Sequence, residues 1–393
     1  MAQRRTLAAI VIAGLLCRLA YTFFTPAFYA PDENSHFNYV KFLSEHRAFP
    51  LQTTKMGDPA NEWEYFQPPF YYLLLVPVYR AAEFLFHSQL ATIFALRLVS
   101  ILLWLITLRL AALWLRQLEI KDDLLRISTL SLVCLLPTYT FISAVINNDN
   151  LLVPLGGAIL CLLTRNEQTY KECVSSCLLI GILLGLGLLV KQSALVLALA
   201  ILLVPTVDLL RHRKTLFEAI WRTGLPLAIA ALIYLPWALR NWRVYGTFTP
   251  ESLSAVPKSW PSIMRGLASA AHNLIKSFWS VSGIANNIGY PLAAIGMLFM
   301  MLAFYGLLRR WKQFPDCVDL ITKHSPLFTA LAIAVMGNVV LVLYFGYQTG
   351  MGQGRHLFGL LFPIALILAC GSRSLAFQNS FLRAAGFWIR TPC

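Results

Sequence analysis

A series of apolar runs, each long enough to cross a lipid bilayer as a helix, dominates the chain. A transmembrane helix needs ~20 mostly apolar residues, and runs of about that length lie near residues 6–25, 91–115, 125–146, 149–164, 174–190, 193–210, 219–238, 288–308, 327–346 and 356–371. Of the 393 residues 58% are hydrophobic and only 13% are charged, against roughly 25% charged residues in soluble domains. The sequence therefore predicts an all-α integral membrane protein with about ten transmembrane helices in a single polytopic domain, residues 1–393.

The distribution of lysine and arginine predicts which loops face the cytoplasm. The formal net charge is +14, but the basic residues lie mostly in short loops between apolar runs, as in RHRK at 211–214 and RRWK at 309–312. Cytoplasmic loops carry such an excess, so we expect both chain ends inside and the long segments 26–90 and 239–287 outside. The lipid bilayer, and not nucleic acid, is the expected partner of this charge.

Two adjacent acids follow the first apolar run. In PDENSH, Asp32 and Glu33 precede His36 by about one helical turn, and apolar residues recur at helical spacing through 34–46. This pattern predicts an amphipathic helix on the membrane surface with the acids at its N-terminus. Two interpretations of the acids stay open here. Asp32 could cap the helix, or one carboxylate could act in catalysis; capping does not need two adjacent carboxylates.

Further polar residues stand at the predicted outer ends of the apolar runs. A second amphipathic stretch, EYFQPPFYYLLLVPVYR at 64–80, is rich in the aromatic residues typical of the membrane interface. The other outer polar residues are Asn148 and Asp149 in the turn NNDN, Lys191 in VKQSAL, Arg240 in LRNWRVYG, and Arg355 and His356 in GQGRH.

Three of these outer residues are cations on the side where positive charge is disfavoured. Lys191, Arg240 or Arg355 alone could extend to lipid headgroups, but together they favour a specific anion. Two carboxylates with several cations at one membrane face suit a reaction on a lipid phosphate. An acid would activate an acceptor hydroxyl, and the cations would hold the departing phosphate.

Several of these motifs together resemble a known superfamily. They are PDENSH, QPPFYYLLLVP, ALRLVS, NNDN, VKQSAL, LRNWRVYG and GQGRHLFGLLFP, which run in this order over nearly the whole chain. In order and placement they look like the GT-C superfamily of polyprenyl-phosphate-sugar-dependent glycosyltransferases. They look most like its bacterial branch with a P-D-E-x-x-H motif in the first outer loop, although His356 stands where that branch frequently has tyrosine.

The resemblance implies a GT-C-like fold and an inverting hexosyl or pentosyl transfer at the outer face of the cytoplasmic membrane. It implies a polyprenyl-phosphate-linked sugar donor and a glycan, lipid or protein acceptor, with the active site facing the periplasm or exterior. Carried onto this sequence, it makes Asp32, then Glu33, the candidate general base, and Lys191, Arg240 and Arg355 the candidate phosphate ligands. His36, Asn148, Asp149 and His356 become candidates for binding or orienting the substrates.

Two alternatives remain at this point. Asp32, Glu33 and His36 could offer three ligands to a divalent metal, but their spacing lacks the paired-histidine signature of a zinc helix, so we predict no required metal or other cofactor. A transporter or flippase of a lipid-linked or anionic substrate would also use intramembrane charges and about ten spans. The apolar runs show no two-fold internal pattern, which favours the transferase, and a non-catalytic scaffold would leave the outer acids dispensable.

Overall fold

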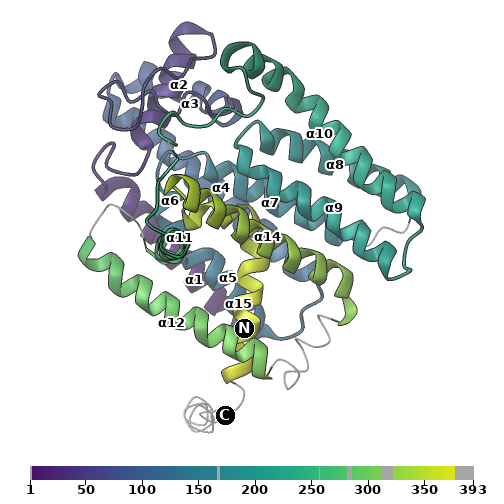
Figure 1. Ribbon diagram of the computed structural model, residues 1–393. Coiled ribbons are helices and arrows are strands. Elements are labelled where there is room, and N and C mark those ends of the chain that lie inside the picture. Colours follow the sequence, from purple (N-terminus) through teal and green to yellow (C-terminus); the bar gives the residue numbers. More distant parts are fainter. Residues whose placement is uncertain (1, 166–168, 256, 281–285, 311–321, 377–393) are drawn as a thin grey trace.

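The structure is a computed structural model that describes residues 2–165, 169–255, 257–280, 286–310 and 322–376. Within these ranges it consists of helices and their connections, without a β-strand (Figure 1). The helices are α1 (Ala2–Phe24), α2 (Glu33–His46), α3 (Phe70–Phe86), α4 (Gln89–Gln117), α5 (Asp123–Leu135), α6 (Pro137–Ile142), α7 (Asp149–Thr164), α8 (Tyr170–Leu188), η1 (Gln192–Ala194), α9 (Leu195–Leu210), α10 (Leu216–Tyr245), α11 (Ile263–Trp279), α12 (Asn286–Arg310), α14 (Ser325–Thr349), η3 (Gly354–Leu360) and α15 (Leu361–Ala376).

Among the described residues, eight helices are long and apolar enough to cross a membrane, two fewer than the predicted ten. The predicted span 125–146 is broken into α5 and α6, because Pro137 disfavours the helical conformation for the residue before it, and Leu136 accordingly has ψ 118°. The predicted span 149–164 forms α7, whose 16 residues fall short of a regular span.

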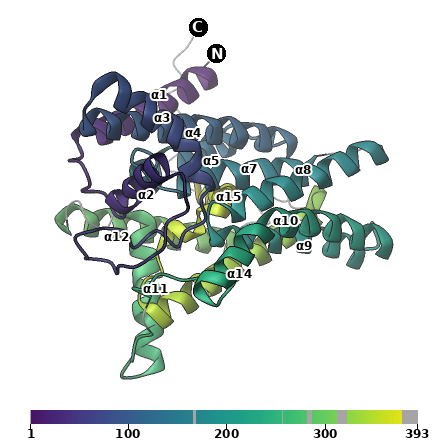
Figure 2. The same cartoon turned by 90° about the horizontal axis from the view of Figure 1, so that it is seen from above.

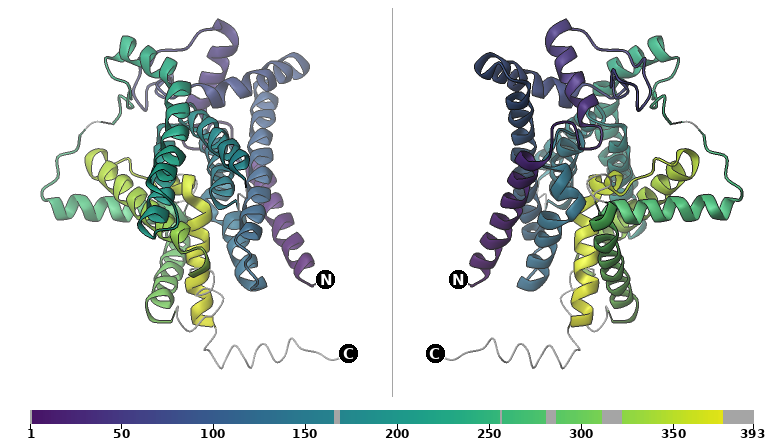
Figure 3. Two further views of the ribbon diagram at one scale, coloured as in Figure 1. Left: turned by 90° about the vertical axis from the view of Figure 1, so that its right-hand side faces the viewer. Right: turned by 90° about the vertical axis from the view of Figure 1, so that its left-hand side faces the viewer.

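The predicted outer segment 26–90 and the chain ends lie at opposite ends of the molecule. Figure 3 shows the start of α1 and the end of α15 at one end, with α2 and α3 at the other. This arrangement agrees with the expected topology, although the side of the membrane that each end faces stays a prediction. The predicted basic cluster at 309–312 includes Trp311 and Lys312, which lie outside the described residues.

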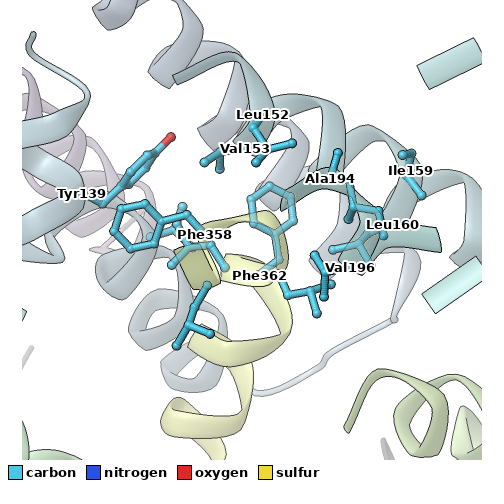
Figure 4. Close-up of a cluster of buried hydrophobic side chains, with 14 of the residues drawn as sticks. Tyr139, Leu152, Val153, Ile159, Leu160, Ala194, Val196, Phe358 and Phe362 are labelled. Carbon is cyan, nitrogen blue, oxygen red and sulfur yellow. The ribbon is translucent and has the colours of Figure 1, made fainter. Parts of the chain in front are cut away.

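The long helices surround α15 and the short 3-10 helix η3 before it. Seen from above, α4, α5, α7 and α8 form one row (Figure 2), and α15 packs against α5, α12 and α14. Phe358 and Phe362 insert between Tyr139 on one side and side chains of α7, η1 and α9 on the other (Figure 4). Because the segment Gly354–Arg373 is largely enclosed by protein, it can hold polar groups at its Gly354 end away from lipid.

Both predicted juxtamembrane helices of the first outer segment are present. α2 covers the predicted range, and Tyr39 stacks on Tyr72 of α3 with ring centroids 3.9 Å apart. Lys41 and Glu45 form an exposed pair on the opposite face of α2. The boundary of the later outer segment differs from the prediction, because α10 continues to Tyr245 before Gly246 ends it with φ 72°.

Candidate active site

Asp32 stands at the start of α2 with its carboxylate turned away from the helix. Its backbone is left-handed, with φ 67°, and its side chain makes no capping hydrogen bond. Asp tolerates this region better than most residues do. The carboxylate instead accepts a hydrogen bond from Arg355 Nη2 and forms an ion pair with it. The capping interpretation of Asp32 is therefore wrong.

Arg355 is held by the irregular backbone before α15. The regular helix begins at Leu361, five residues after the predicted start of the last span, and η3 carries Arg355 and His356. The backbone N–H of Gly354 donates to Ser277 Oγ at 2.7 Å, and a β-carbon at Gly354 would lie 2.4 Å from the backbone of Phe278. The end of α11 thus fixes the position of η3. Only glycine, which has no β-carbon, permits the two backbones to approach this closely.

Lys191 and Asp149 form a second ion pair beside the first. Lys191 follows α8 in an extended conformation and donates from Nζ to Asp149 Oδ1 at 2.6 Å. Arg355 Nε lies 4.0 Å from Asp149 Oδ2. The predicted residues Asp32, Asp149, Lys191 and Arg355, from four distant parts of the sequence, thus form one charged cluster, which is nearly closed to solvent.

Glu33 points in a different direction from Asp32. Its carboxylate receives two hydrogen bonds from Arg97 of α4, at 2.8 and 2.6 Å, and one from the backbone N–H of Ile146 at 3.1 Å. Both charged side chains are fully buried, and Arg97 also donates to the carbonyls of Thr22 and Thr25. Through these hydrogen bonds Glu33 joins α1, α2 and α4 to the 143–148 turn. It does not line the cavity described below.

His36 connects α2 to that turn. Its Nδ1 lies 2.9 Å from Tyr72 Oη, and its Nε2 lies 3.3 Å from Asn147 Nδ2. Burial, the largest effect, lowers the pKa of His36 to about 3, and the charges of Lys191 and Arg355 act in the same direction. The ring is therefore neutral at pH 7, and it accepts or donates hydrogen bonds without carrying charge.

A cavity of about 460 Å³ opens onto these residues. Its polar lining includes Asp32, His36, Glu64, Asn148, Lys191, Arg355 and His356. Its apolar lining includes Leu195, Val196, Leu341, Val342, Phe345 and Met351. The cavity therefore joins a charged end to a wall of α9 and α14 side chains, as a molecule with a polar head and an apolar tail requires.

Arg240 does not line this cavity, unlike Lys191 and Arg355. Its guanidinium donates to the carbonyl of Pro50 at 2.5 Å and lies over the Trp237 ring, 4.6 Å from the ring centroid. Arg240 therefore joins α10 to the loop after α2. The structure does not bring it to the other two predicted phosphate ligands.

Glu64 is a cavity residue that the sequence analysis did not single out. It is 5% exposed, and its Oε2 has no hydrogen-bond partner among the described residues. Burial and, next, the negative charge of Asp32 raise the pKa of Glu64 to about 8, although the charges of Lys191 and Arg355 oppose this rise. For Asp32, burial alone would raise the pKa, but the charge and hydrogen bond of Arg355 act with other nearby groups, Lys191 among them, to hold the pKa below the usual value. The two acids thus differ in protonation at pH 7.

Asp32, His36 and Glu64 each offer one ligand atom within 4.8 Å of the others, the one such group among the described residues. Arg355 is paired with one oxygen of Asp32, and its charge and that of Lys191 oppose a cation at this position. We therefore do not assign these residues as metal ligands.

No protein-family model and no curated protein sequence matches the chain. Solved structures do match its fold. ArnT from Cupriavidus metallidurans bound to undecaprenyl phosphate aligns with a TM-score of 0.58 and 13% identity, over 96% of this chain and 63% of that one. The archaeal oligosaccharyltransferase AglB from Archaeoglobus fulgidus, in complex with an inhibitory peptide and a dolichol-phosphate, aligns with a TM-score of 0.57 and 13% identity, over 98% of this chain and 52% of that one.

These two proteins are GT-C superfamily glycosyltransferases with bound polyprenyl phosphate. The chain spans less than two thirds of the length of either, and at this identity the likeness concerns the fold. With its eight apolar helices, the chain is a multi-pass membrane protein with the GT-C fold.

Proposed function

We propose that the protein transfers a hexosyl or pentosyl group from a polyprenyl-phosphate donor to an acceptor hydroxyl on a glycan, lipid or protein. The observation that carries this proposal is the cavity that joins Asp32, Lys191 and Arg355 to an apolar wall. A prenyl chain fits the apolar lining, and a phosphate fits the two cations. The fold likeness to proteins with bound undecaprenyl phosphate and dolichol-phosphate supports the choice of lipid.

The charged cluster suggests how donor binding prepares the base. Arg355 pairs with Asp32 in the structure, and a donor phosphate competes with Asp32 for the same guanidinium. Once phosphate neutralises part of the Arg355 charge, the pKa of Asp32 rises from its depressed value, because its stabilising partner is shared. Binding of the donor therefore makes the Asp32 carboxylate a stronger base.

In the proposed reaction the acceptor oxygen attacks the anomeric carbon of the sugar from the face opposite the phosphate. The bond between that carbon and the phosphate oxygen breaks, and the phosphate leaves with the electron pair while Lys191 and Arg355 hold it. The acceptor proton passes to Asp32. A single displacement of this kind inverts the configuration at the anomeric carbon.

The remaining predicted residues take supporting roles in this scheme. Asp149 pairs with Lys191 and orients its ammonium group, while His36, Asn148 and His356 line the cavity as neutral or polar contacts for the sugar and acceptor. Glu33, fully enclosed against Arg97, is a positioning residue that fixes the backbone of Asp32. Asp32 alone of the adjacent acids reaches the cavity.

We further propose that no metal or other cofactor is required, because Lys191 and Arg355 supply the positive charge that phosphate departure needs. Retained transfer after treatment with a chelator is the expected result. Loss of transfer on chelation, with rescue by a divalent cation, would contradict this part of the proposal.

The active site is proposed to lie on the periplasmic or exterior side of the inner, cytoplasmic membrane. This follows from the position of α2 and α3 at the end opposite the chain ends and from the bias of lysine and arginine in the sequence.

The function is tested by incubating the purified protein with an undecaprenyl phosphate-linked radiolabelled hexose or pentose and extracted cell-envelope material. We expect label to move from the lipid fraction into an acceptor with the parent protein, and not with Asp32→Asn. Equal transfer by the parent and by a sample without protein, for each sugar used, would contradict the proposal.

A further inference from the structure

Glu64 is a buried acid that the proposed reaction does not use. It lies in the loop between α2 and α3, where its backbone N–H donates to Ser35 Oγ at 2.9 Å. This contact to α2 holds the residue at the cavity wall, and its Oε2 is enclosed without a partner in the part of the chain that the structure describes. A buried polar atom left unpaired costs free energy unless something else satisfies it.

The position of Glu64 relative to the reacting groups indicates what could satisfy it. Lys191 and Arg355 mark the donor phosphate, and Asp32 marks the acceptor hydroxyl. The transferred sugar must lie between the two. A carboxyl oxygen of Glu64 lies within 4.8 Å of one of Asp32, close enough for both side chains to contact a single sugar ring.

The charges of the cavity decide which hydrogen bond Glu64 can make. The carboxylates of Asp32 and Asp149 balance the cations of Lys191 and Arg355. A third carboxylate at Glu64 would make this end negative and repel a phosphate donor. A neutral carboxyl group keeps the balance, and it has an O–H to donate.

We propose that Glu64 is a further substrate-binding residue, whose carboxyl group donates a hydrogen bond to a hydroxyl oxygen of the donor sugar. This inference rests on the proposed function and adds a residue that contacts the sugar rather than the lipid. The titratable and charged groups that face Glu64 are Asp32, His36, Tyr72, Lys191 and Arg355. Asp32 opposes loss of the Glu64 proton, and the two cations favour it. The raised pKa of Glu64, about 8, agrees with a donating carboxyl at neutral pH.

Comparing the affinities for two lipids, one with the sugar and one without it, distinguishes contact with the sugar from contact with the phosphate. The probes are undecaprenyl phosphate and the undecaprenyl phosphate-linked hexose or pentose that the parent uses in transfer, measured at pH 7. Glu64→Ala should bind undecaprenyl phosphate like the parent, which also shows that it is folded. It should bind the sugar-bearing lipid about 2- to 12-fold more weakly, which is the loss of affinity expected when one hydrogen bond between neutral groups is removed. Glu64→Gln, which still donates, should keep the parent affinity.

The pH dependence supplies a second readout that a merely structural role would not change. As the pH rises through about 8, the parent should lose affinity for the sugar-bearing lipid, because Glu64 gives up the proton it donates and becomes negative. Glu64→Gln should show no such loss. Glu62→Ala is the matched control, since Glu62 lies two residues earlier and accepts from Thr53 outside the cavity.

Parent-like affinity of Glu64→Ala for the sugar-bearing lipid would overturn the inference and leave the proposed function intact. So would a loss in Glu64→Gln as large as that in Glu64→Ala, because it would mean that Glu64 accepts rather than donates. Failure of the parent to bind undecaprenyl phosphate at all would overturn the proposed function, and this inference with it.

Discussion

At the scale of single residues, the two adjacent acids have separate environments and, in the proposed reaction, separate functions. Asp32 pairs with Arg355 beside the cavity, and Glu33 pairs with Arg97, which is fully buried in the protein. The left-handed backbone at Asp32 turns its carboxylate toward the cavity while Glu33 begins α2 facing Arg97. In the proposed reaction, two neighbouring residues thus serve proton transfer and structural support, respectively.

Asp32→Asn should leave binding of undecaprenyl phosphate intact or tighter, because Asn no longer holds the Arg355 charge. Transfer should fall by ~10²- to 10⁴-fold, since an amide cannot take the acceptor proton. Both quantities can be measured on one preparation. Glu45→Gln, on the exposed face of α2, is the control that should change neither. Parent-like transfer by Asp32→Asn would remove Asp32 as the base.

Glu64 should also make the folded protein less stable as the pH rises. Its pKa is about 8 in the fold, against an ordinary value of 4.5, so the unfolded chain releases this proton first. The free energy of unfolding should therefore decrease between about pH 4.5 and pH 8. Thermal unfolding in detergent at a series of pH values should show a smaller decrease for Glu64→Gln than for the parent. Identical slopes would contradict the burial of a neutral acid here.

Sequence reasoning found some site residues because their charge is out of place. Asp32, Lys191 and Arg355 are charges next to apolar runs, and the cavity contains all three. Arg240 carries the same signal but uses its charge to hold a loop, a difference that depends on tertiary structure. The buried ion pair of Arg97 could have been predicted from the sequence, since an arginine inside an apolar helix implies a buried partner. Glu64 had no local signal, because its environment comes from residues distant in sequence.

At the scale of elements, the short and broken helices position the site. Lys191 directly precedes the 3-10 helix η1, and Arg355 lies within the 3-10 helix η3. The turn with Asn147 and Asn148 follows the break at Leu136. The number and type of most helices could be predicted, because apolar length alone specifies a span. The 3-10 segments could not, because they depend on contacts such as that between Gly354 and the end of α11.

Gly156→Ala tests the contact between α7 and η3. A β-carbon there would lie 2.6 Å from the carbonyl oxygen of Gly359, so η3 must shift and carry Arg355 with it. We expect a loss of about 1 to 3 kcal/mol in stability and weaker binding of undecaprenyl phosphate. Gly224→Ala, in α10, is the control because no atom of the described residues lies within 4 Å of its added carbon, and it should be neutral or slightly stabilising. Equal behaviour of the two variants would mean that the contact does not hold η3 in place.

At the scale of the whole molecule, the fold places a charged cluster at the Gly354 end of the span Gly354–Arg373, which is largely enclosed by other helices. The cost of such charges in a membrane is reduced because each cation has a carboxylate partner and protein surrounds both. In the proposed reaction a lipid-linked donor brings its phosphate to this cluster while its chain stays among apolar residues. No part of the reaction needs to cross the bilayer.

Cysteine labelling tests this orientation. A cysteine introduced for Ser259, exposed in the loop before α11, should react with an impermeant reagent added from outside intact cells. A cysteine introduced for Thr215, exposed at the start of α10, should react only after the membrane is opened. The unmodified parent gives the background from native cysteines. The reverse pattern would place the cavity on the cytoplasmic side.

Native mass spectrometry of the purified protein with undecaprenyl phosphate tests most directly whether this cavity binds a lipid phosphate. The parent should bind one lipid, and Lys191→Ala and Arg355→Ala should each bind it about ten-fold more weakly or worse, since a hydrogen bond from a charged group to phosphate contributes ~1.5–3 kcal/mol. Arg240→Ala removes a cation at the same end of the molecule but outside the cavity, and it should bind like the parent. Equal affinity in all four proteins, or no binding by the parent, would contradict a phosphate site between Lys191 and Arg355.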